Sequence, residues 1–357
     1  MTGAGARASR RRVNVALVMP ARNEEAAVDM TLEAVFASSR LPDEILIADG
    51  MSTDRTVERI KRFEGRGVPL RILSNPSRFS GGGRNLGIRH ATSEIILLAD
   101  FGNVMDRDWI EEMVRPFEEL DGVEMVAGLH RPLVTSDFEH CVAAIQYHEQ
   151  CMLAHYTPAE RESLLGRSVI PGGASLGLTR ATWERVGGYP EWLPRAQDRL
   201  FSRKAWAVGV RIEVNWRACT SHHMRRSPAE VFRQTLSYGR GNGRSRCADR
   251  QIFKLGGFYA LLVAAGAGTV ISWWCLALAG VLGAAYLYRR GLRRLIRVDG
   301  GLRRLGYLVF VPGVVVAADV GSLVGHLLGW LEWWCIPRYR RLFFAYTTGC
   351  TPLPVLQ

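Results

Sequence analysis

The carboxylates in three short polar stretches are the first candidates for chemistry, because each stretch directly follows an apolar run. The stretches span residues 20–25, 49–54 and 100–103, and the third ends the sequence IILLADFGN at 95–103. An apolar run that stops at a lone carboxylate is typical of a buried strand, and α/β sheets bind ligands at the carboxyl ends of their strands. We therefore expect Asp49 and Asp100 to face a ligand, such as a nucleotide or a metal ion.

The same stretches also have structural explanations. Asn23 could cap the helix that follows it, and Ser52, Thr53 and Asp54 are good caps for the next helix. The stretch at 20–25 lacks the G-x-G-x-x-G pattern, which argues against a dinucleotide-binding Rossmann unit. Asp-Phe-Gly also occurs in protein kinases, but neither an H-R-D loop nor a strand lysine precedes it here.

The elements that must position these residues alternate between strand and helix. Short apolar runs predict strands at 13–19, 44–48, 70–73, 94–99 and 125–128. Amphipathic stretches predict helices at 24–38, 54–63, 83–91, 108–120 and 137–156. Strand and helix in alternation imply right-handed crossovers and a mostly parallel sheet, so the predicted fold class is α/β.

Composition limits the size of the protein and the kind of partner it can have. The chain has 357 residues, 48% of them hydrophobic, and a formal net charge of +12. That length predicts two domains, or one domain with an appendage. A basic balance suits an anionic membrane surface, a phosphorylated substrate or nucleic acid. Aromatic residues are not interleaved with the basic ones as in a nucleic-acid groove, so we expect no nucleic acid as a partner.

The cysteines and the start of the chain indicate a cytosolic setting. The seven cysteines show neither zinc-ligand nor redox spacing, which is typical of reduced cysteines. Residues 1–12 are basic and rich in small side chains, and we expect them to be disordered. The run at 13–19 is short for the core of a signal peptide and contains Asn14, so a strand is the better interpretation.

The composition changes sharply after Lys254. Residues 255–288 carry no charge, residues 289–304 are rich in arginine, and a second apolar segment at 305–331 is interrupted only by Asp319 and His326. Both apolar segments are long enough to cross a bilayer, which takes about 20 residues. A pair of buried helices in a soluble protein is the alternative. Asp319 and His326 are seven residues apart, so on a helix they share one face and should point into protein.

The arginines constrain the topology of these segments. If each segment crossed once, the arginines would lie on the side opposite the N-terminal domain, against the positive-inside rule. We therefore expect residues 255–288 to form a tight or re-entrant hairpin that keeps the arginines cytoplasmic. Four glycines would let its helices approach closely: Gly266, Gly268, Gly280 and Gly283.

A series of motifs resembles the family 2 glycosyltransferases with the GT-A fold. The family's P-x-x-N-E turn is matched by Pro20, Asn23 and Glu24, and its D-G-S-x-D-x-T turn by residues 49–56. The sequence SGGGRNLG at 80–87 looks like the family's A-R-N-x-G helix start, and Asp100 is placed like the first acid of D-x-D.

The second half continues the resemblance in the same order. The G-G, G-G-[FY] and E-D motifs are matched by residues 172–173, 186–189 and 197–198. Residues 222–227 and 233–241 look like the distal segment of membrane-associated exopolysaccharide glycosyltransferases. The resemblance covers about residues 13–243, and the order of its motifs makes it specific.

The resemblance implies a role for each matched residue. Asp49 would bind the nucleobase or ribose of a nucleoside diphosphate sugar, and Asp100 the ribose or a metal. Asp198 would be the general base that deprotonates the acceptor, so that the sugar is transferred by direct displacement with inversion. Arg240 and Arg244 could supply charge to the diphosphate. The other matched residues expected at the substrate are Pro20, Asn23, Glu24, Arg84, Gly172 and Gly173.

Two departures from the family pattern bear on these roles. Gly102 replaces the second acid of D-x-D, so a two-acid metal clamp is lacking, and Asn103 is one residue late. A Mg²⁺ or Mn²⁺ ion could still be held by Asp100, water and the diphosphate, with His222 or His223 helping. Gln197 replaces the glutamate of the E-D motif, which removes a charge beside the proposed base.

The sequence thus predicts a membrane-anchored, inverting glycosyltransferase with a lipid-linked or polysaccharide acceptor. Its expected parts are a GT-A domain at 13–250 on the cytoplasmic side, membrane-embedded helices at 251–335 and a C-terminal tail at 336–357. A non-catalytic scaffold of a polysaccharide assembly is one alternative, suggested by Gly102 and Gln197. A nucleotidyltransferase is another, although the G-x-G-x-R loop of that class is absent.

Overall fold

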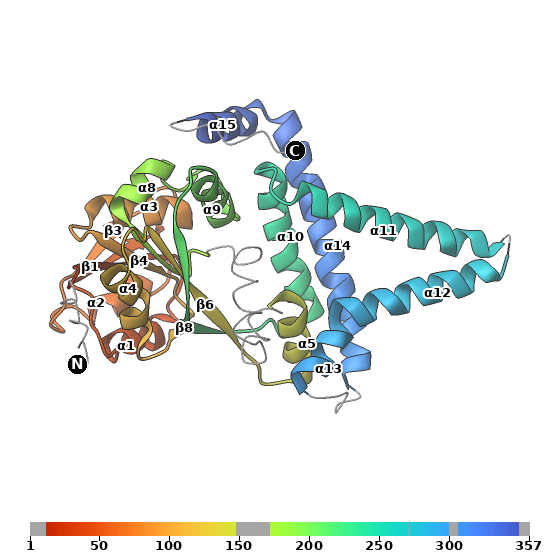
Figure 1. Cartoon of the computed structure of the whole chain (residues 1–357), viewed down its shortest axis with the longest axis horizontal. Coiled ribbons are helices and arrows are strands. Elements are labelled where there is room, and N and C mark those ends of the chain that lie inside the picture. Colours follow the sequence, from red (N-terminus) through yellow and green to blue (C-terminus); the bar gives the residue numbers. More distant parts are fainter. Residues whose placement is uncertain (1–11, 148–171, 271, 300–305, 350–357) are drawn as a thin grey trace, which may run out of the picture.

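In the computed structural model, the chain forms an α/β domain from which a helical arm projects (Figure 1). The structure describes residues 12–147, 172–270, 272–299 and 306–349. Several predictions fall in part outside these residues: the disordered start, the end of the helix at 137–156, the end of the arginine-rich stretch and the end of the C-terminal tail.

The α/β domain contains an eight-stranded sheet in the order β3-β2-β1-β4-β7-β6-β8-β5. Its strands are β1 (Val15–Ala21), β2 (Glu44–Asp49), β3 (Leu70–Ser74), β4 (Ile95–Ala99), β5 (Val104–Met105), β6 (Met125–Leu133), β7 (Ser175–Thr179) and β8 (Ile212–His223). The pairs β2–β3, β1–β2, β1–β4 and β6–β8 are parallel, whereas β7 runs antiparallel to β4 and β6, and β5 to β8. This mixed, mostly parallel sheet confirms the predicted α/β class.

Helices cover both faces of the sheet because side chains alternate along each strand. They are α1 (Val28–Phe36), α2 (Thr56–Lys61), α3 (Ser80–His90), α4 (Trp109–Glu119), α8 (Arg180–Val186) and α9 (Gln197–Ala207), whereas α5 (Asp137–Gln146) packs in a separate core with helices that follow later in the chain. Val15, Leu17 and Met19 of β1 join the core formed with α1, α2 and α4. Ala16 and Val18 join the core formed with α3, α8 and α9. The carboxyl ends of β1, β2 and β4 therefore open onto one shared edge.

Every predicted strand is present, but the prediction omits β5, β7 and β8. The first strand begins at Val15, later than predicted, and β6 runs on to Leu133, past its predicted end. β5 is too short to show a pattern, and β7 (SLGLT) contains few apolar residues. β8 is half-buried along much of its length, so its sequence lacks an apolar run.

The rest of the chain forms the arm, beginning with a helix that packs on the domain. The helices are α10 (Pro228–Arg244), α11 (Asp249–Ala267), η2 (Gly268–Val270), α12 (Trp274–Leu287), η3 (Tyr288–Leu292), α13 (Arg293–Asp299), α14 (Gly306–Cys335) and α15 (Pro337–Thr348). α11 and α12 lie side by side and project away from the domain, so the predicted hairpin is present (Figure 1). By length and composition, the helices Asp249–Val270 and Gly306–Cys335 could cross a membrane.

Three of the four hairpin glycines do not have the predicted role. A Cβ added at Gly266, Gly280 or Gly283 would meet no atom within 4 Å, so these three positions do not hold the two helices together. Gly268 alone of the four makes a close approach, with its ideal Cβ 2.9 Å from the sulfur of Cys275.

Close glycine contacts instead join α14 to α10. They involve Gly321, Gly325 and Gly329, which are spaced four residues apart and so share one face of α14. A Cβ at Gly325 would overlap the carbonyl oxygen of Leu236, and one at Gly329 would overlap that of Arg240. Only glycine permits this approach of the two backbones, so α14 is docked on one side against the helix that leaves the α/β domain.

Asp319 and His326 point into protein, as predicted, with exposed fractions of 2% and 4%. Asp319 accepts hydrogen bonds from the phenols of Tyr259 at 3.2 Å and Tyr286 at 2.6 Å, and pairs with Arg290 at 3.4 Å. His326 Nε2 lies 2.8 Å from the carboxylate of the first residue of α11. These polar contacts tie the hairpin to α14.

Candidate active site

The turns after β1 and β2 are held together by hydrogen bonds. The Asn23 N–H donates to Ser52 Oγ at 2.9 Å, and Asn23 Oδ1 accepts the Thr53 N–H at 2.9 Å. The Glu24 N–H donates to Thr56 Oγ1 at 2.7 Å. Asn23 has a left-handed φ of 56°, which asparagine tolerates. It therefore joins the two turns and does not cap α1.

Asp49 ends β2 at the shared edge and is 9% exposed. Its carboxylate accepts the Ser52 N–H at 3.2 Å. The Gly50 N–H donates to the Ala21 carbonyl at 2.7 Å, and a Cβ at Gly50 would lie only 3.2 Å from that oxygen. Pro20, Asn23, Glu24 and Asp49 are thus brought together by these turns, and their contact with a donor stays a prediction.

A buried arginine connects the start of α3 to the turn after β4. Arg84 is 2% exposed, and its Nη2 donates to Asp100 Oδ1 at 2.6 Å. Burial alone would lower the pKa of Arg84, but the charge of Asp100, together with Tyr189 and Asp198, raises it. The guanidinium is therefore charged, while its Nε and Nη1 have no hydrogen-bond partner in the described part of the chain.

The glycine pair before β7 packs against this guanidinium. A Cβ added at Gly173 would overlap Cζ of Arg84. A Cβ at Gly172 would lie 3.9 Å from Asp198 Oδ2 and 3.7 Å from His130 Nε2, which is ordinary contact. The pair therefore lies where Arg84, Asp198 and His130 come together, and glycine is required at 173 but not at 172.

Asp198 lies in the first turn of α9, just after Ala196, which has a left-handed φ of 63°. Its Oδ1 accepts the N–H of Arg199 at 2.8 Å. The neighbouring Gln197 is buried, and its Nε2 donates to Ser80 Oγ at 2.6 Å. The residue that departs from the family's E-D motif thus ties α9 to the start of α3.

The asparagine after Arg84 organises the turn after α8. Asn85 Oδ1 accepts the Tyr189 N–H at 2.8 Å and the indole N–H of Trp183 at 2.9 Å, and its Nδ2 donates to the Tyr189 carbonyl at 2.9 Å. Gly187 and Gly188 have φ values of 86° and 72°, which favour glycine. The R-N and G-G-Y motifs therefore lie side by side. Arg84 binds Asp100, and the next residue, Asn85, binds the turn at Tyr189.

The C-terminal helix also contacts this turn. Tyr346 Oη donates to the Gly188 carbonyl at 2.8 Å, and Lys204 Nζ donates to the Tyr346 carbonyl at 2.8 Å. Lys204 is 2% exposed, and its Nζ lies 4.5 Å from the centre of the Tyr346 ring. The predicted C-terminal tail thus contains a helix docked on the segment that leads to Asp198.

His130, near the middle of β6, is a site residue that was not predicted from the sequence. Its Nδ1 lies 2.9 Å from Thr220 Oγ1. Burial lowers the pKa of His130, although the charges of Asp100 and Asp198 oppose the shift. A lone histidine outside any motif gave no signal, because only the pairing of β6 with β8 and the fold of α9 bring it to the site.

His222, predicted as a metal ligand, lies beside His130. The ring centres of the two histidines are 5.9 Å apart, and that of Tyr147 is 4.8 Å from His222. Burial, together with His130, Arg225 and His223, lowers the pKa of His222 to about 4. The imidazole is therefore neutral at pH 7, and its Nδ1 is buried without a partner among the described residues.

Three acids gather where the turns meet Asp100. Burial, together with the charges of Asp100 and Asp54, raises the pKa of Glu24 to about 7, while Arg195 opposes this. Glu24 is therefore close to half-protonated at neutral pH. A cation that approached these acids would favour its ionised form.

The arginine that faces this region is Arg195, which the sequence analysis missed because it belongs to no motif. Arg195 is exposed, and its guanidinium carbon lies 5.7 Å from the centre of the Tyr238 ring. Arg240 is bound elsewhere, since its Nε donates to Glu332 at 2.9 Å. Arg244 Nε donates to the same carboxylate at 2.6 Å. A donor diphosphate would therefore have to compete with Glu332 of α14 for the Arg240 guanidinium.

The protein side chains alone do not complete a metal site. Within the described residues, no group of three or more His, Cys, Asp or Glu is placed to hold a metal ion. Gly102 has a left-handed φ of 84°, and the buried Asn103 engages Thr31 through its carbonyl. Asp100 is left as the acid of this turn, and Mg²⁺ is often held by one carboxylate plus substrate phosphates. The residues therefore fit a metal that arrives with a diphosphate.

A family model describes the part of the chain that contains these strand-end turns. Residues 16–164 match the model of glycosyl transferase family 2. This chain contains a family 2 glycosyltransferase domain. The match runs from β1 past α5 and so includes Asp49, Arg84 and Asp100.

The family 2 domain and part of the arm are similar to curated proteins. The succinoglycan biosynthesis protein ExoA of Rhizobium meliloti (strain 1021) is 24% identical over 278 residues, which are 76% of this chain and 83% of that protein. The O-antigen chain rhamnosyltransferase RfbN of Salmonella typhimurium (strain LT2) is 22% identical over 229 residues, 64% of this chain and 72% of that protein.

A solved structure resembles nearly the whole chain. The mannosyltransferase PcManGT from Pyrobaculum calidifontis, in complex with GDP-Man and Mn²⁺, has a TM-score of 0.54 and 19% identity. The likeness covers 89% of this chain and 88% of that one. At that identity it shows the fold, and the predicted GT-A fold is confirmed.

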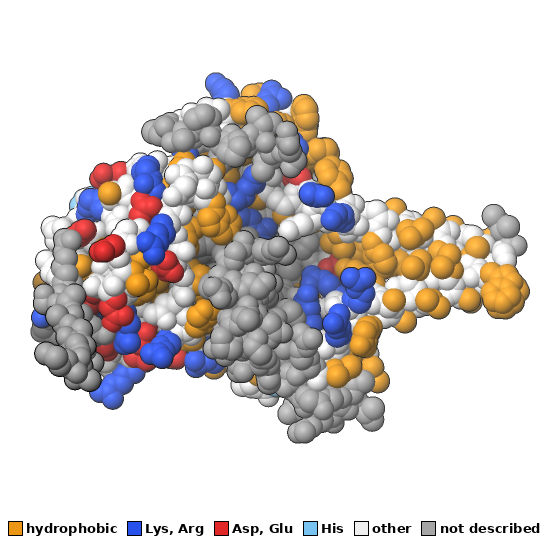
Figure 2. All heavy atoms as spheres, in the orientation of Figure 1, with side chains coloured by type: hydrophobic (Ala, Val, Ile, Leu, Met, Phe, Trp, Pro, Cys, Tyr) orange, Lys and Arg blue, Asp and Glu red, His pale blue; other side chains and the backbone are white. Residues whose placement is uncertain are grey.

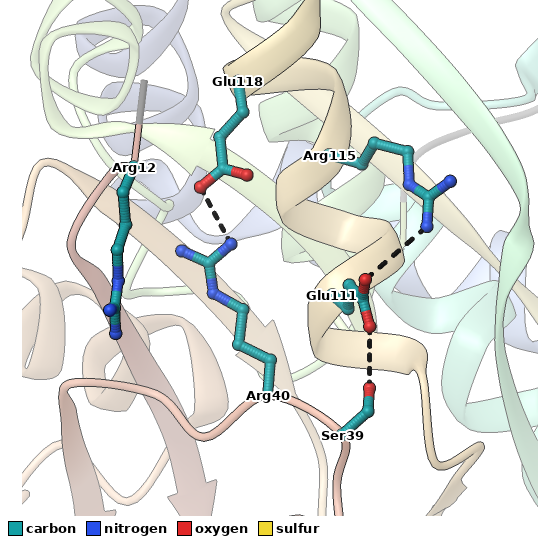
Figure 3. A pocket seen from close by; sticks show the side chains of 6 residues that line it. All are labelled: Arg12, Ser39, Arg40, Glu111, Arg115 and Glu118. Carbon is teal, nitrogen blue, oxygen red and sulfur yellow. Dashed lines mark hydrogen bonds and ion pairs between the residues drawn. The ribbon is translucent and has the colours of Figure 1, made fainter. Parts of the chain in front are cut away.

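A separate hollow lies at the opposite edge of the family 2 domain (Figure 3). Its lining is polar and consists of Arg12, Ser39, Arg40, Glu111, Arg115 and Glu118. Arg40 donates to Glu118 at 2.8 Å and to the Val13 carbonyl, just before β1, at 2.9 Å. This hollow is therefore at the amino end of β1, away from the residues at the strand carboxyl ends.

Proposed function

We propose that the protein is an inverting glycosyltransferase that moves a sugar from a nucleoside diphosphate sugar to a lipid-linked or polysaccharide acceptor. The observation that carries the proposal is the convergence of Asp100 and Asp198 on the buried Arg84 guanidinium. Asp100 belongs to the strand ends, where α/β sheets bind nucleotides. A donor bound there would place its sugar close to a second carboxylate on α9.

Asp198 is the proposed general base. Its carboxylate accepts the proton of the acceptor hydroxyl while that oxygen forms a bond to the anomeric carbon. The bond from this carbon to the diphosphate oxygen breaks, and the nucleoside diphosphate leaves with the electron pair. Attack from the face opposite the leaving group inverts the configuration.

The leaving diphosphate needs positive charge around it. We propose Arg195 for this, because it is exposed and has no carboxylate partner among the described residues. A bound Mg²⁺ or Mn²⁺ would neutralise the same charge, held by Asp100 with His222 as a further ligand. The Mn²⁺ and GDP-Man in the structural relative support a metal that binds with the donor. Asp49 is the proposed contact to the nucleoside.

The arm is the proposed attachment to the cytoplasmic face of the cell membrane. Arg290 Nη1 donates to the Ile145 carbonyl of α5 at 3.1 Å, and Arg294 Nη1 donates to the same oxygen at 3.3 Å. These contacts with the family 2 domain support a placement of the arginines on its side of the membrane, which the positive-inside rule favours. The names of the relatives, which refer to succinoglycan biosynthesis and an O-antigen chain, support an acceptor that belongs to a growing polysaccharide.

Turnover of nucleotide sugars by the full chain in lipid vesicles tests the proposal. UDP-, GDP- and dTDP-sugars would be screened for stabilisation of the protein, and the released nucleotide would be identified. Asp198→Asn should keep donor binding but lower transfer by about 10²–10⁴-fold, the usual contribution of a general base. Glu184→Gln, the same chemical change at an exposed residue of α8, should leave transfer unchanged.

Three outcomes would contradict the proposal. Near-normal transfer by Asp198→Asn would remove that residue as the base. Release of a sugar 1-phosphate instead of a nucleoside diphosphate would indicate transfer of the nucleotidyl group, as in a nucleotidyltransferase. Binding of a donor without any turnover would favour the non-catalytic scaffold.

A further inference from the structure

We infer that α14 lies along the membrane surface without crossing it, and that the hairpin of α11 and α12 is the described part of the arm that enters the bilayer. The inference rests on the proposed membrane attachment and specifies its geometry. It differs from the usual expectation for an apolar helix of this length, which is a transmembrane span.

The first end of α14 packs on the family 2 domain. The ring of Phe310 lies 5.8 Å from that of Phe138, and the ring of Tyr307 lies 6.3 Å from that of His140. Phe138 and His140 belong to α5, which also accepts the hydrogen bonds of Arg290 and Arg294.

The second end of α14 returns to the same domain. After Cys335 the chain continues into α15, and Tyr346 of α15 donates to the Gly188 carbonyl beside the active-site turn. Glu332, in the last turn of α14, binds Arg240 and Arg244 of α10. Because both ends of α14 contact one domain, they cannot lie on opposite sides of a bilayer.

The two faces of α14 have different surroundings. One face is docked on α10 through Gly321, Gly325 and Gly329, as described above. The opposite face carries exposed apolar side chains toward both ends of the helix, at Val309 (72%), Val316 (49%), Leu327 (51%) and Leu331 (56%), whereas residues 317–323 between them are buried or half-buried. A helix of this length extends about 45 Å, more than the roughly 30 Å of the hydrocarbon core. An apolar face of that extent suits a helix that lies along the lipid surface.

The hairpin has the opposite character, since it lacks a protein cover on most sides. Exposed fractions are 70% for Val263, 65% for Leu276 and 67% for Val281. In Figure 1 the hairpin extends crosswise to α14 and away from the family 2 domain. Figure 2 shows apolar side chains along the hairpin and basic ones at its base. If the hairpin enters the bilayer from this base, α14 lies parallel to the membrane surface.

Depth measurements with spin labels distinguish an in-plane α14 from a crossing one. Val309, Val316, Leu327 and Leu331 would each be changed to cysteine in the full chain, with the seven native cysteines replaced by alanine. The protein would be placed in vesicles of phosphatidylethanolamine and phosphatidylglycerol, and accessibility to oxygen and to a soluble nickel chelate would be compared. We expect four similar, shallow depths in lipid. Labels at Leu261 and Val281 of the hairpin should be deeper and serve as the control.

A depth that rises toward Val316 and falls again toward Leu331 would refute the inference, because the labelled positions span about 33 Å of helix axis. Free access of the nickel chelate to all four would refute it as well. Labelling of Arg293→Cys and Arg338→Cys, which flank α14, by an impermeant thiol reagent gives a second measurement. Both should react from the same side of sealed vesicles.

Failure of this inference is separable from failure of the proposed function. A crossing α14 in a protein that still transfers sugar would overturn only the geometry. Release of the unmodified chain from vesicles by high salt would overturn the membrane attachment itself.

Discussion

Arg84 carries a charge in a place where two of its nitrogens find no acceptor among the described residues. Leaving a buried polar group unpaired costs about 1–3 kcal/mol, and native proteins tolerate such groups mostly at functional sites. Its Nη2 is satisfied by Asp100, and the glycine at 173 leaves room for the rest of the guanidinium. The arginine therefore links the donor-side acid to the proposed base, and the space around it should be sensitive to single methyl groups.

Gly173→Ala should destabilise the protein and reduce transfer, because the added Cβ would overlap the Arg84 guanidinium. Overpacking of a filled site typically costs about 1–3 kcal/mol. Gly172→Ala is the matched control, since its Cβ would make only ordinary contacts, and its unfolding free energy should be close to that of the wild type. Denaturant unfolding of both variants checks the expectation. Equal stabilities would show that the arginine moves aside freely.

Glu24 should make the stability of the protein depend on pH. Burial and its acidic neighbours raise its pKa from the usual 4.5 to about 7. The folded state therefore holds the proton more tightly than the unfolded chain, so this contribution to stability is present at low pH and is lost as the pH rises through about 7. Glu24→Gln should remove that loss. Thermal unfolding of the wild type and the variant between pH 4.5 and 8 tests this, and parallel curves would contradict it.

The residues of this site that were predicted are those that belong to short sequence motifs with fixed spacing. Arg84, Asn85 and Asp100 follow strands or start helices at fixed spacing. Arg84 donates a hydrogen bond to Asp100, and Asn85 donates one to the Tyr189 carbonyl of another motif. His130 and Arg195 reach the same region only through long-range strand pairing and the turn before α9. A single sequence contains no local pattern for such contacts, which explains why both were missed.

At the scale of elements, α15 connects the helical arm to the turn at Gly188 beside the candidate site. Tyr346→Phe should lower kcat without changing the KM for the donor, because the lost hydroxyl bond to Gly188 is worth about 0.5–1.5 kcal/mol and orders the segment that leads to Asp198. Tyr339→Phe removes a hydroxyl of the same helix for which we find no hydrogen bond within the described residues, and should leave kcat unchanged. Steady-state kinetics of the two variants give the comparison. An equal effect of both would show that α15 is not a positioning element.

The strands that were predicted from the sequence are those with a continuous apolar run. β1, β2 and β4 are nearly fully buried, so their apolar runs stand out in the sequence, and the half-buried edge strand β3 keeps a short apolar run. β7 is inserted antiparallel between β4 and β6, and β8 has mixed burial, so neither shows an apolar run or a clear alternation. The hairpin was predicted from the distribution of charge along the sequence. The docking of α15 depends on tertiary contacts alone, so the sequence did not predict it.

At the scale of the whole molecule, the glycines of α14 determine how the arm meets the domain. Gly325→Ala should destabilise the protein although alanine favours helices by about 1 kcal/mol, because its Cβ would overlap the Leu236 carbonyl. Gly313→Ala on the same helix has open space around it and should be neutral or slightly stabilising. Thermal unfolding in detergent compares the two. A neutral Gly325→Ala would mean that α10 and α14 separate without cost.

The backbone contact between α10 and α14 also limits how such enzymes can be recombined. α10 follows the last strand of the α/β domain directly in the sequence, whereas α14 comes after the hairpin. A chimera could join the α/β domain and α10 of this chain to the C-terminal helices of a relative. The relative's helix in place of α14 would then lie against the Leu236 carbonyl, where any side chain is excluded. α10 and α14 therefore have to be exchanged together if a hybrid protein is to fold and work.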